Sequence, residues 1–370
     1  MTSEHETGVV RLCAAWGRGP AVVVESLSTV GFSGSPVQLV TLADAVGRFV
    51  LKPFAPHVTR ERAEWVHGLM RHARAAGVAE VPEVLTPADG GSSVVEDRTG
   101  RRWELVQFVE GQPCASPTPP RAAAALDVLA RLHLALRSAV HAAPDDGRSP
   151  GVERRIEQAS ELLARPLSRR CAARVDASEE PSSGIDCVAR VRAACRAADQ
   201  HLATPLGRRG LTAIATARIG PVQRQAVVRD IWSDHVLFDT AAADRVAGIV
   251  DFHAAAIDTP LTDIARLLGS WEWPSRGSEP AASGITARWP GPLAAYADAR
   301  GAPLTAADRW LCDWLHASAV ICGLDNWFRW ILEESRRFPD TNRALERIHA
   351  LLAELPHAVD WLARAGNQPV

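Results

Sequence analysis

The sequence predicts an α+β protein with a small N-terminal antiparallel β lobe of five strands and one helix, followed by a large, mainly helical C-terminal lobe. Three observations predict this arrangement. Runs of β-branched residues fill much of the first 110 residues, a Gly/Pro-rich stretch occupies residues 111–120, and helical periodicity dominates beyond it. A chain of 370 residues is long enough for two lobes. We therefore expect an N-terminal lobe at residues 1–110 and a helical lobe at residues 111–370.

The N-terminal lobe contains the five predicted strands and its single helix. The strand segments are rich in β-branched residues and are separated by short turns, at residues 21–28, 35–42, 47–54, 92–97 and 101–111. The helix covers residues 59–77, because apolar side chains recur there at helical spacing. Thr59 is a candidate N-cap for this helix and Gly77 a stop signal.

The C-terminal lobe begins with a strong helical pattern at residues 121–139. Residues 144–221 mix helical pieces with Gly-, Pro- and Arg-rich connectors, which is typical of an insertion. A short strand pair follows, "VLFD" and "RVAGIVDF", and Trp-bearing helices occupy residues 292–370.

Composition excludes several classes of protein. Hydrophobic residues make up 47% and charged residues 23%, as in ordinary globular proteins, and a net charge of -2 gives no electrostatic basis for binding nucleic acid. No run of 18 apolar residues is present, and the acidic start "MTSEHETGVVRL" lacks the pattern of a secretion signal. The seven Cys include no CxxC pair. We expect a cytoplasmic protein that binds neither nucleic acid nor membrane, and the oligomeric state stays open.

One lysine stands out in this composition. The chain has 41 Lys and Arg residues, of which Lys52 is the single lysine. A protein that uses Arg for its other cations has reason to keep Lys where a compact ammonium is required and a planar guanidinium does not fit. Chance placement is the alternative, but the position of Lys52 within a predicted strand favours function.

The segment "VVRDIWSDHVLFD" and the strand after it carry the strongest signal for chemistry. Asp230 and His235 are five residues apart, and Asp251 ends the second strand of the pair, 21 residues after Asp230. Such a hairpin brings two carboxylates to one side of a cleft. Phosphoryl transfer needs one carboxylate to accept the proton of a hydroxyl and another to hold a metal ion. Asp-rich turns would explain either residue alone, but they explain poorly both together downstream of Lys52.

With these residues in this order, the chain resembles the aminoglycoside phosphotransferase and choline kinase-like family, which has a protein-kinase-like bilobal fold. The resemblance covers roughly residues 20–350. It implies an ATP-dependent phosphotransferase that moves the γ-phosphoryl group to a hydroxyl of a small molecule. It also implies that Asp230 is the catalytic base, that Lys52 pairs the α- and β-phosphates, and that Asp251 and His235 bind Mg²⁺.

The resemblance assigns further residues to the nucleotide. In "VGFSG", the loop between the first two strands, it implies phosphate contacts from Gly31, Ser33 and Gly34, although a plain hairpin turn is also consistent with these letters. Glu61 would be the acidic partner of Lys52 on the following helix, with Glu64 as the alternative. The hinge would bind adenine through the backbone of three residues, Gln107, Phe108 and Val109.

Three positions depart from the family pattern: Val228 replaces His, His253 replaces Gly, and His235 replaces the metal-binding Asn. The last matters most, because imidazole nitrogen suits softer ions such as Mn²⁺ better than Mg²⁺. His235 is then a metal ligand, or Asp234 takes that role, or the second metal site is lost. The third outcome would make the protein a catalytically impaired nucleotide-binding pseudokinase or regulatory protein, and a purely structural helical scaffold is a further alternative.

Two more features follow from the resemblance. Asp258, Pro260 and Asp263 match a family pattern beyond the metal-binding Asp, where Thr259 would cap a helix and Asp263 would be structural. The C-terminal helices would bind the acceptor. Their aromatic and acidic residues suit an amine- or sugar-containing molecule, although Trp at helical spacing is also typical of a core: Trp310, Trp314, Trp327, Trp330, Asp313, Asp325, Glu333 and Glu334.

Overall fold

The computed structural model describes residues 9–17, 21–27, 37–43, 47–139, 145–171, 182–272 and 284–365. By its internal contacts the chain forms two compact units. The first comprises residues 1–144, 225–257 and 294–302, and the second comprises residues 145–224, 258–293 and 303–370. The predicted lobe boundary between residues 110 and 111 stays a prediction.

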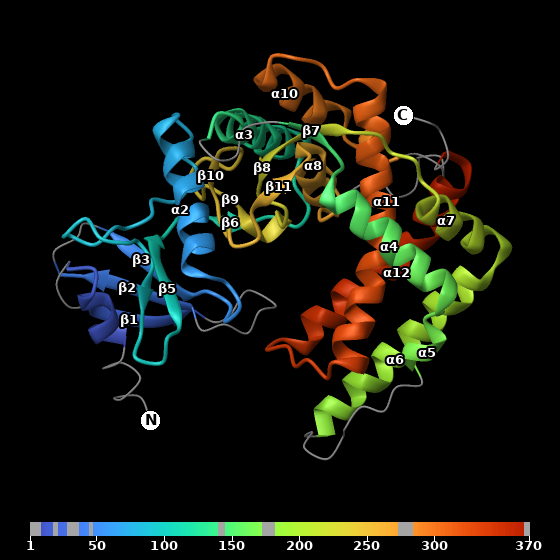
Figure 1. The fold of residues 1–370 in the computed structure, drawn as a ribbon, viewed down its shortest axis with the longest axis horizontal. Helices are drawn as coiled ribbons and strands as arrows, with labels where there is room; N and C mark the ends of the chain where they lie inside the picture. The colour runs from blue at the N-terminus through green and yellow to red at the C-terminus, as the bar shows by residue number, and fades with distance from the viewer. Residues whose placement is uncertain are drawn as a thin grey trace. The chain divides into compact units, whose positions relative to one another are not determined.

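The first unit contains an antiparallel five-stranded sheet with strand order β1-β2-β3-β5-β4 (Figure 1). Its strands are β1 (Ala21–Leu27), β2 (Val37–Leu42), β3 (Arg48–Pro53), β4 (Val95–Glu96) and β5 (Arg102–Gln107). Apolar side chains of β2, β3 and β5, such as Val40, Leu51 and Leu105, are fully buried in one core cluster. The five-stranded sheet predicted from sequence is confirmed.

Helix α2 (Arg60–Ala75) lies between β3 and β4 in the chain and packs its apolar side chains inward. The side chain of Thr59 accepts a hydrogen bond from the N–H of Arg62, so the predicted N-cap is confirmed. Gly77 ends the helical stretch with φ +94°, a conformation that favours glycine. A short helix at residues 9–14, which the sequence reasoning did not predict, adds Cys13 to the sheet core.

The rest of the first unit presents the predicted catalytic segment. Helix α3 (Pro119–Arg137) is capped by Thr118 and packs against strand β10. A small antiparallel sheet has the order β10-β9-β6, formed by β6 (Gln112–Pro113), β9 (Val236–Phe238) and β10 (Val246–Ile249). The predicted strand pair is thus present, and a turn of 3-10 helix, η1 (Ser233–His235), leads into β9.

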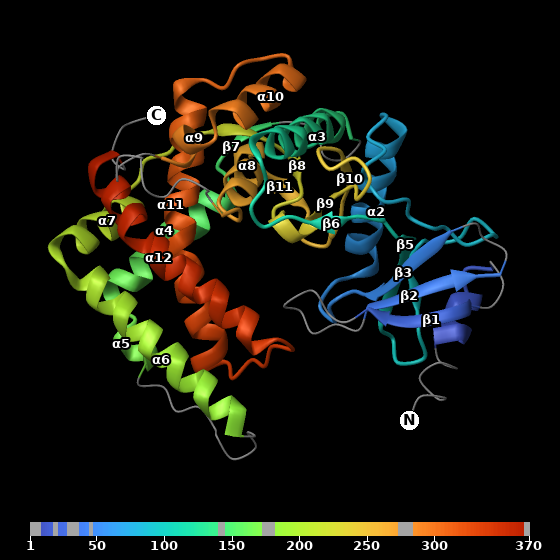
Figure 2. The ribbon, with the colours of Figure 1, turned by 180° about the vertical axis from the view of Figure 1, so that it is seen from behind.

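The second unit is built mainly of helices. Helix α11 packs against α8 and α12, and α12 packs against α6 and α7 (Figure 2). The described helices are α4 (Pro150–Ala164), α5 (Ser168–Cys171), α6 (Ser182–Ala203), α7 (Pro205–Ala215), α8 (Pro260–Leu268), α9 (Ile285–Arg288), α11 (Ala306–Phe328) and α12 (Thr341–Ala365), with a π-helical turn η2 (Arg329–Glu333) after α11.

Three short elements complete the fold: β7 (Asp145–Gly147), β8 (Val222–Val227) and β11 (Ala256–Asp258). Helix α10 (Pro290–Arg300) continues the chain from the second unit into the first. Thr259 takes the N-cap position of α8 with Pro260 first in the helix, as predicted, but its side chain makes no capping hydrogen bond. Among the described helices, none is long and apolar enough to cross a membrane.

Candidate functional site

Lys52 and Asp251, which the sequence predicts to bind the phosphates and the metal ion, contact each other in the first unit. Lys52 lies near the end of β3, and its Nζ donates a hydrogen bond of 2.7 Å to Oδ1 of Asp251, two residues after β10. Burial alone would raise the pKa of Asp251, but Lys52, together with His235 and His253, lowers it well below its usual range. The structure therefore joins an ammonium and an ionised carboxylate from positions 199 residues apart.

Asp230 follows strand β8 and is oriented by its own loop. The indole N–H of Trp232 donates to Oδ1 of Asp230 over 2.7 Å. Arg229, immediately before it, has φ +67°, and Asp251 has φ +65°. Left-handed backbone at residues other than glycine is uncommon and gathers at functional sites. The two predicted acidic positions are thus held by unusual backbone on both segments.

His235 connects these two segments. Its Nδ1 lies 2.8 Å from the carbonyl oxygen of Asp230, and because a carbonyl only accepts, Nδ1 carries the hydrogen and donates. The other ring nitrogen, Nε2, lies 3.8 Å from Oδ2 of Asp251. Metal-ligating histidines commonly donate the N–H of the other ring nitrogen to a backbone carbonyl, as Nδ1 of His235 does here.

The acidic residues at the start of α2 make other contacts. Glu61 lies in the exposed first turn, where its own backbone N–H and the Thr59 hydroxyl lower its pKa. Glu64 accepts a hydrogen bond from Ser92. The ion pair of Lys52 is with Asp251. A role for Glu61 beside Lys52 therefore stays a prediction, and so do the roles of Gly31, Ser33 and Gly34, which lie outside the described residues.

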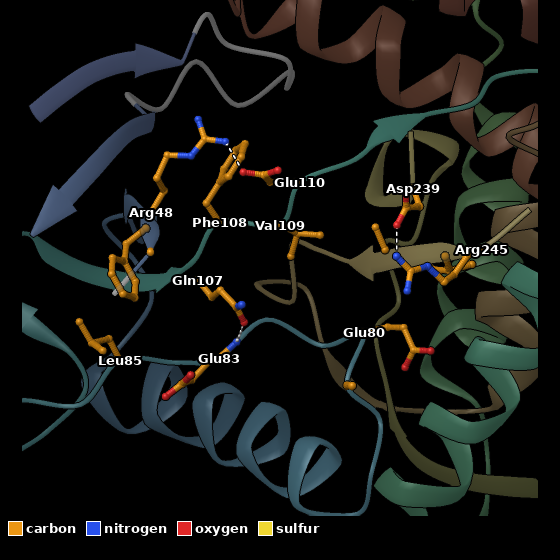
Figure 3. Close-up of a pocket in the computed structure, with 15 residues that line it drawn as sticks. Arg48, Glu80, Glu83, Leu85, Gln107, Phe108, Val109, Glu110, Asp239 and Arg245 are labelled. Atoms are coloured by element: carbon orange, nitrogen blue, oxygen red, sulfur yellow. Dashed lines mark hydrogen bonds and ion pairs between the residues drawn. The ribbon is translucent and has the colours of Figure 1, made fainter. Parts of the chain in front are cut away.

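The hinge residues Gln107, Phe108 and Val109 border a cavity of about 820 Å³ (Figure 3). The N–H of Gln107 donates to the Glu83 carbonyl and that of Phe108 to the Arg48 carbonyl, both over 2.8 Å. Within the described part of the chain, the Val109 N–H has no such acceptor. Among the described residues, Val109 is therefore the hinge residue whose N–H these backbone hydrogen bonds leave unused.

The cavity is lined by both charged and apolar residues. Its charged side chains are largely paired, Arg48 with Glu110 and Arg245 with Asp239, as Figure 3 shows. Its other lining residues are Gly47, Phe49, Ala79, Glu80, Glu83, Leu85, Val246 and Ala247, so Lys52 and Asp251 are not part of its wall. The cavity follows the hinge but does not contain the predicted phosphate-binding centre.

Several residues of the site escaped the sequence reasoning. Glu104 of β5 is 4% exposed and faces Lys52 in the strand register, yet its carboxylate contacts His67 and His253. Arg62 of α2 donates to the carbonyl oxygen of Ala255. Burial does not alternate along β5, where Trp103, Glu104 and Leu105 are all buried, so no local pattern singles out Glu104 or names its partners.

Two acidic residues that the sequence offers for acceptor binding, Asp325 and Asp313, already have partners. Asp325, 1% exposed, accepts from Arg170 over 2.7 Å and from Gln158 over 2.6 Å. Asp313 accepts two hydrogen bonds from Thr286, and burial raises its pKa. Trp314 is fully buried. Packing therefore accounts for much of the aromatic and acidic pattern of these helices.

Asp258 has a structural position in the second unit. Its carboxylate accepts hydrogen bonds from the Ser149 hydroxyl and from the N–H groups of Gly151 and Thr259. It thereby connects the start of α4 with the start of α8. Asp263, also fully buried, lies in the first turn of α8, where the sequence predicted a structural role.

Comparison with known proteins adds the family context. Residues 30–314 match the phosphotransferase enzyme family. A homoserine kinase from Brucella anthropi is 26% identical over 236 residues, which cover 61% of this chain and 57% of that protein. The chain thus matches little more than half the length of this relative.

Solved structures match nearly the whole chain. A spectinomycin phosphotransferase in complex with ADP and spectinomycin has a TM-score of 0.61 at 9% identity, covering 97% of this chain and 98% of the other. An amicoumacin kinase in complex with AMP-PNP and Ca²⁺ has a TM-score of 0.56 at 14% identity, covering 96% of each. At these identities the likeness concerns the fold, which is the kinase-like fold of aminoglycoside phosphotransferases.

Proposed function

Because the chain belongs to the phosphotransferase enzyme family, a family of small-molecule kinases that bind ATP, we propose that it transfers the γ-phosphoryl group of ATP to a hydroxyl of a small molecule. The observation that carries the proposal is the meeting of Lys52, Asp251 and His235 beside the loop of Asp230. This set supplies a phosphate-binding cation, a metal-binding carboxylate and a base in one unit.

Asp230 acts as the base in this proposal. The acceptor hydroxyl loses its proton as the new O–P bond forms and the bond to the β-phosphate oxygen breaks, and the Asp230 carboxylate accepts that proton. Trp232, which donates to Oδ1, fixes the rotamer of the carboxylate. Correct placement matters because positioning and electrostatic stabilisation supply most of the catalysis in phosphoryl transfer.

Lys52 and Asp251 neutralise each other in the absence of nucleotide. When nucleotide binds, Lys52 exchanges the carboxylate for the α- and β-phosphates, which leaves Asp251 to hold a divalent cation. Such an ion would offset the negative charge of the phosphates. In this proposal the nucleotide and its cation separate the ion pair of Lys52 and Asp251.

The residues around Asp251 fit a divalent cation held jointly with nucleotide. No group of three or more His, Cys, Asp or Glu side chains within the described residues is arranged to hold a metal by itself. Nucleotide-dependent metal sites commonly use one or two protein ligands and complete the shell with phosphate oxygens and water. Asp251 and His235 would supply those ligands, and the imidazole favours Mn²⁺ over Mg²⁺. Asp234 as the ligand, or loss of the second metal, are the alternatives.

The nucleotide base is proposed to bind at the hinge. The Val109 N–H supplies a donor for the adenine edge, and the carbonyl of Gln107 supplies an acceptor. Gly31, Ser33 and Gly34 would contact the phosphates through their N–H groups, with Glu61 as an additional charged residue near the site. These assignments rest on the family resemblance together with the hinge hydrogen bonds.

The acceptor is a small molecule with a hydroxyl group. Homoserine, spectinomycin and amicoumacin are the molecules that appear in the names of similar proteins. We propose an acceptor of this general kind, with amine or sugar groups. The partners already bound to Asp325 and Asp313 argue that acceptor specificity does not come from these two carboxylates.

A two-stage experiment tests the proposal. Thermal melts with ATP, in EDTA, Mg²⁺ or Mn²⁺, measure nucleotide binding, and release of ADP with a panel of homoserine, spectinomycin, macrolides and simple amino alcohols measures transfer. A kinase raises its Tm with metal and ATP and releases ADP with at least one acceptor. Binding without transfer over the whole panel favours the pseudokinase alternative. Absence of any ATP-dependent Tm shift contradicts the proposal.

A further inference from the structure

A buried chain of polar side chains connects α2 with the segment that contains Asp251. His67 of α2 places Nε2 2.9 Å from Oε2 of Glu104, and His253 places Nε2 2.7 Å from Oε1 of the same carboxylate. Ser93 closes the other end, 2.8 Å from Nδ1 of His67. Each carboxylate oxygen of Glu104 thus accepts from one histidine.

This network is built for a single arrangement. His67 is 0% exposed and Glu104 4%, so an unpaired polar atom at either position would be costly. Burial alone would raise the pKa of Glu104, but the hydrogen bonds and charges of His253 and His67 lower it, which keeps the acceptor ionised. Phe54 stacks on the ring of His253 with centroids 4.3 Å apart and planes 25° apart. The ring of His253 is therefore fixed by a hydrogen bond and by an aromatic neighbour.

The fixed histidine lies two residues after Asp251. The Asp251 backbone has φ +65°, and backbone of this kind persists only where the surrounding structure holds it. Arg62 of α2 supplies a second hold, because it donates to the carbonyl of Ala255. The segment from Asp251 to Ala255 is therefore attached to β5 at its middle residue, His253, and to α2 at its last residue, Ala255.

The position of Glu104 in the sheet would allow it to pair with Lys52, but its hydrogen bonds to the two histidines explain why it does not. Lys52 and Glu104 are directly paired between β3 and β5 and so lie on one face of the sheet. The Lys52 ammonium nevertheless contacts Asp251, while both oxygens of Glu104 are taken by the histidines. Glu104 is therefore linked to the segment of Asp251 through its hydrogen bond with His253 and not through Lys52.

We propose that Glu104 and His253 are positioning residues that hold Asp251 in the geometry for binding the nucleotide's metal ion, with His67 anchoring Glu104 to α2. The inference rests on the proposed function, in which Asp251 is a metal ligand. Outer residues that orient a metal ligand typically contribute about 10–100-fold to metal affinity. His253 stands where the family pattern has glycine. In this proposal its role is to attach the segment after Asp251 to the buried carboxylate of Glu104.

Two variants test the link, with a third as control. Glu104→Gln preserves size but replaces one acceptor oxygen by an amide that donates, so one histidine loses its partner. His253→Gly removes the link and restores the residue of the family pattern. His133→Gln is the matched control, because His133 is also a buried histidine of the first unit, 4% exposed and 2.8 Å from the Tyr296 hydroxyl.

The measured quantity is the ratio of two dissociation constants for a fluorescent ATP analogue, one in EDTA and one in saturating Mn²⁺ or Mg²⁺. We expect the ratio to fall by about 10-fold or more in Glu104→Gln and His253→Gly, while the affinity in EDTA changes little. We expect His133→Gln to lower the Tm and leave the ratio as in the wild type. A lower Tm with an unchanged ratio in both test variants would show a merely structural role and overturn the proposal.

Hydrogen exchange of the free protein gives a readout that needs no ligand. In Glu104→Gln we expect faster exchange of the backbone amides from Asp251 to Ala255 than in the wild type, with β1 and β2 unchanged. Unchanged exchange in this segment also overturns the proposal, even where His253→Gly fails to fold. A wild-type ratio near one is a different failure, since it removes the metal role of Asp251 on which the inference depends.

Discussion

The ion pair between Lys52 and Asp251 makes a counter-intuitive prediction for Asp251→Asn. The two groups are 2.7 Å apart, so a metal-free nucleotide must separate Lys52 from a carboxylate that also repels its phosphates. Asn keeps the size of the side chain and removes its charge. We therefore expect the variant to bind metal-free ATP more tightly than the wild type, although it loses the metal-dependent gain.

The magnitude follows from the exposure of the pair. The side chain of Lys52 is 16% exposed and that of Asp251 34% exposed. Exposed pairs contribute up to about 1 kcal/mol, whereas removing one partner of a fully buried pair costs about 3–5 kcal/mol. For this partly exposed pair, discounted for solvent screening, we take about 1–2 kcal/mol. That corresponds to about 5–30-fold tighter binding of metal-free ATP.

Titration of a fluorescent ATP analogue in EDTA at low salt measures this effect directly. Asp127→Asn is the control, because Asp127 carries the same charge but pairs with Arg131 on the surface of α3. We expect the control to stay within about twofold of the wild type, since screening weakens distant charges. Unchanged or weaker binding of metal-free ATP by Asp251→Asn would refute the competition of phosphate and Asp251 for Lys52.

Three further predictions concern other parts of the chain. Asp230→Ala should keep nucleotide affinity within about threefold and lower ADP release with an acceptor by about 10²–10⁴-fold, since it removes the base; equal losses in binding would contradict this role. His235→Asn should shift the ATP-dependent Tm gain from Mn²⁺ toward Mg²⁺, and an unchanged preference would mean that His235 does not touch the metal. Burial would raise the pKa of Glu354, but His316 at 3.7 Å and Arg288 at 2.7 Å lower it to about 2, from an ordinary value of 4.5. This stabilisation is complete above pH 4.5 and is lost as the pH falls toward 2. Glu354→Gln should therefore lower the free energy of unfolding at pH 7 by up to about 3 kcal/mol, and urea titrations should show a smaller fall of that free energy between pH 4.5 and 2 than in the wild type. An equally steep fall in the variant and the wild type would contradict the assignment.

Local patterns explain which parts of the fold could be predicted. The strands of the first sheet and helix α2 follow from hydrophobic periodicity and from Thr59, because period and capping are properties of neighbouring residues. Composition singles out Lys52 as a candidate site residue, and spacing singles out Asp230 together with Asp251. These signals also point to the type of reaction, because few residue types can bind phosphates, hold a metal ion or act as the base in phosphoryl transfer.

Contacts distant in sequence explain what was missed. Nothing near Lys52 in the sequence indicates that its ammonium pairs with a carboxylate 199 residues away. The same holds for Glu104, which lies within an apolar strand and meets its partners only when α2 and the segment after β10 pack on the sheet. Left-handed backbone at Arg229 and Asp251 also carries no sequence signature, because neither residue is glycine.

The two histidines that depart from the family pattern, His235 and His253, both lie around Asp251 in the structure. In the sequence, His235 and His253 each look like the loss of a family residue, which favours an impaired enzyme. In the structure, His235 lies between the Asp230 loop and Asp251, and His253, two residues after Asp251, is hydrogen-bonded to buried Glu104. A buried carboxylate is costly without such partners, so Glu104 and His253 need each other. His235 and His253 thus both help to hold Asp251 in place. This favours an active kinase with an altered metal site over a catalytically impaired one.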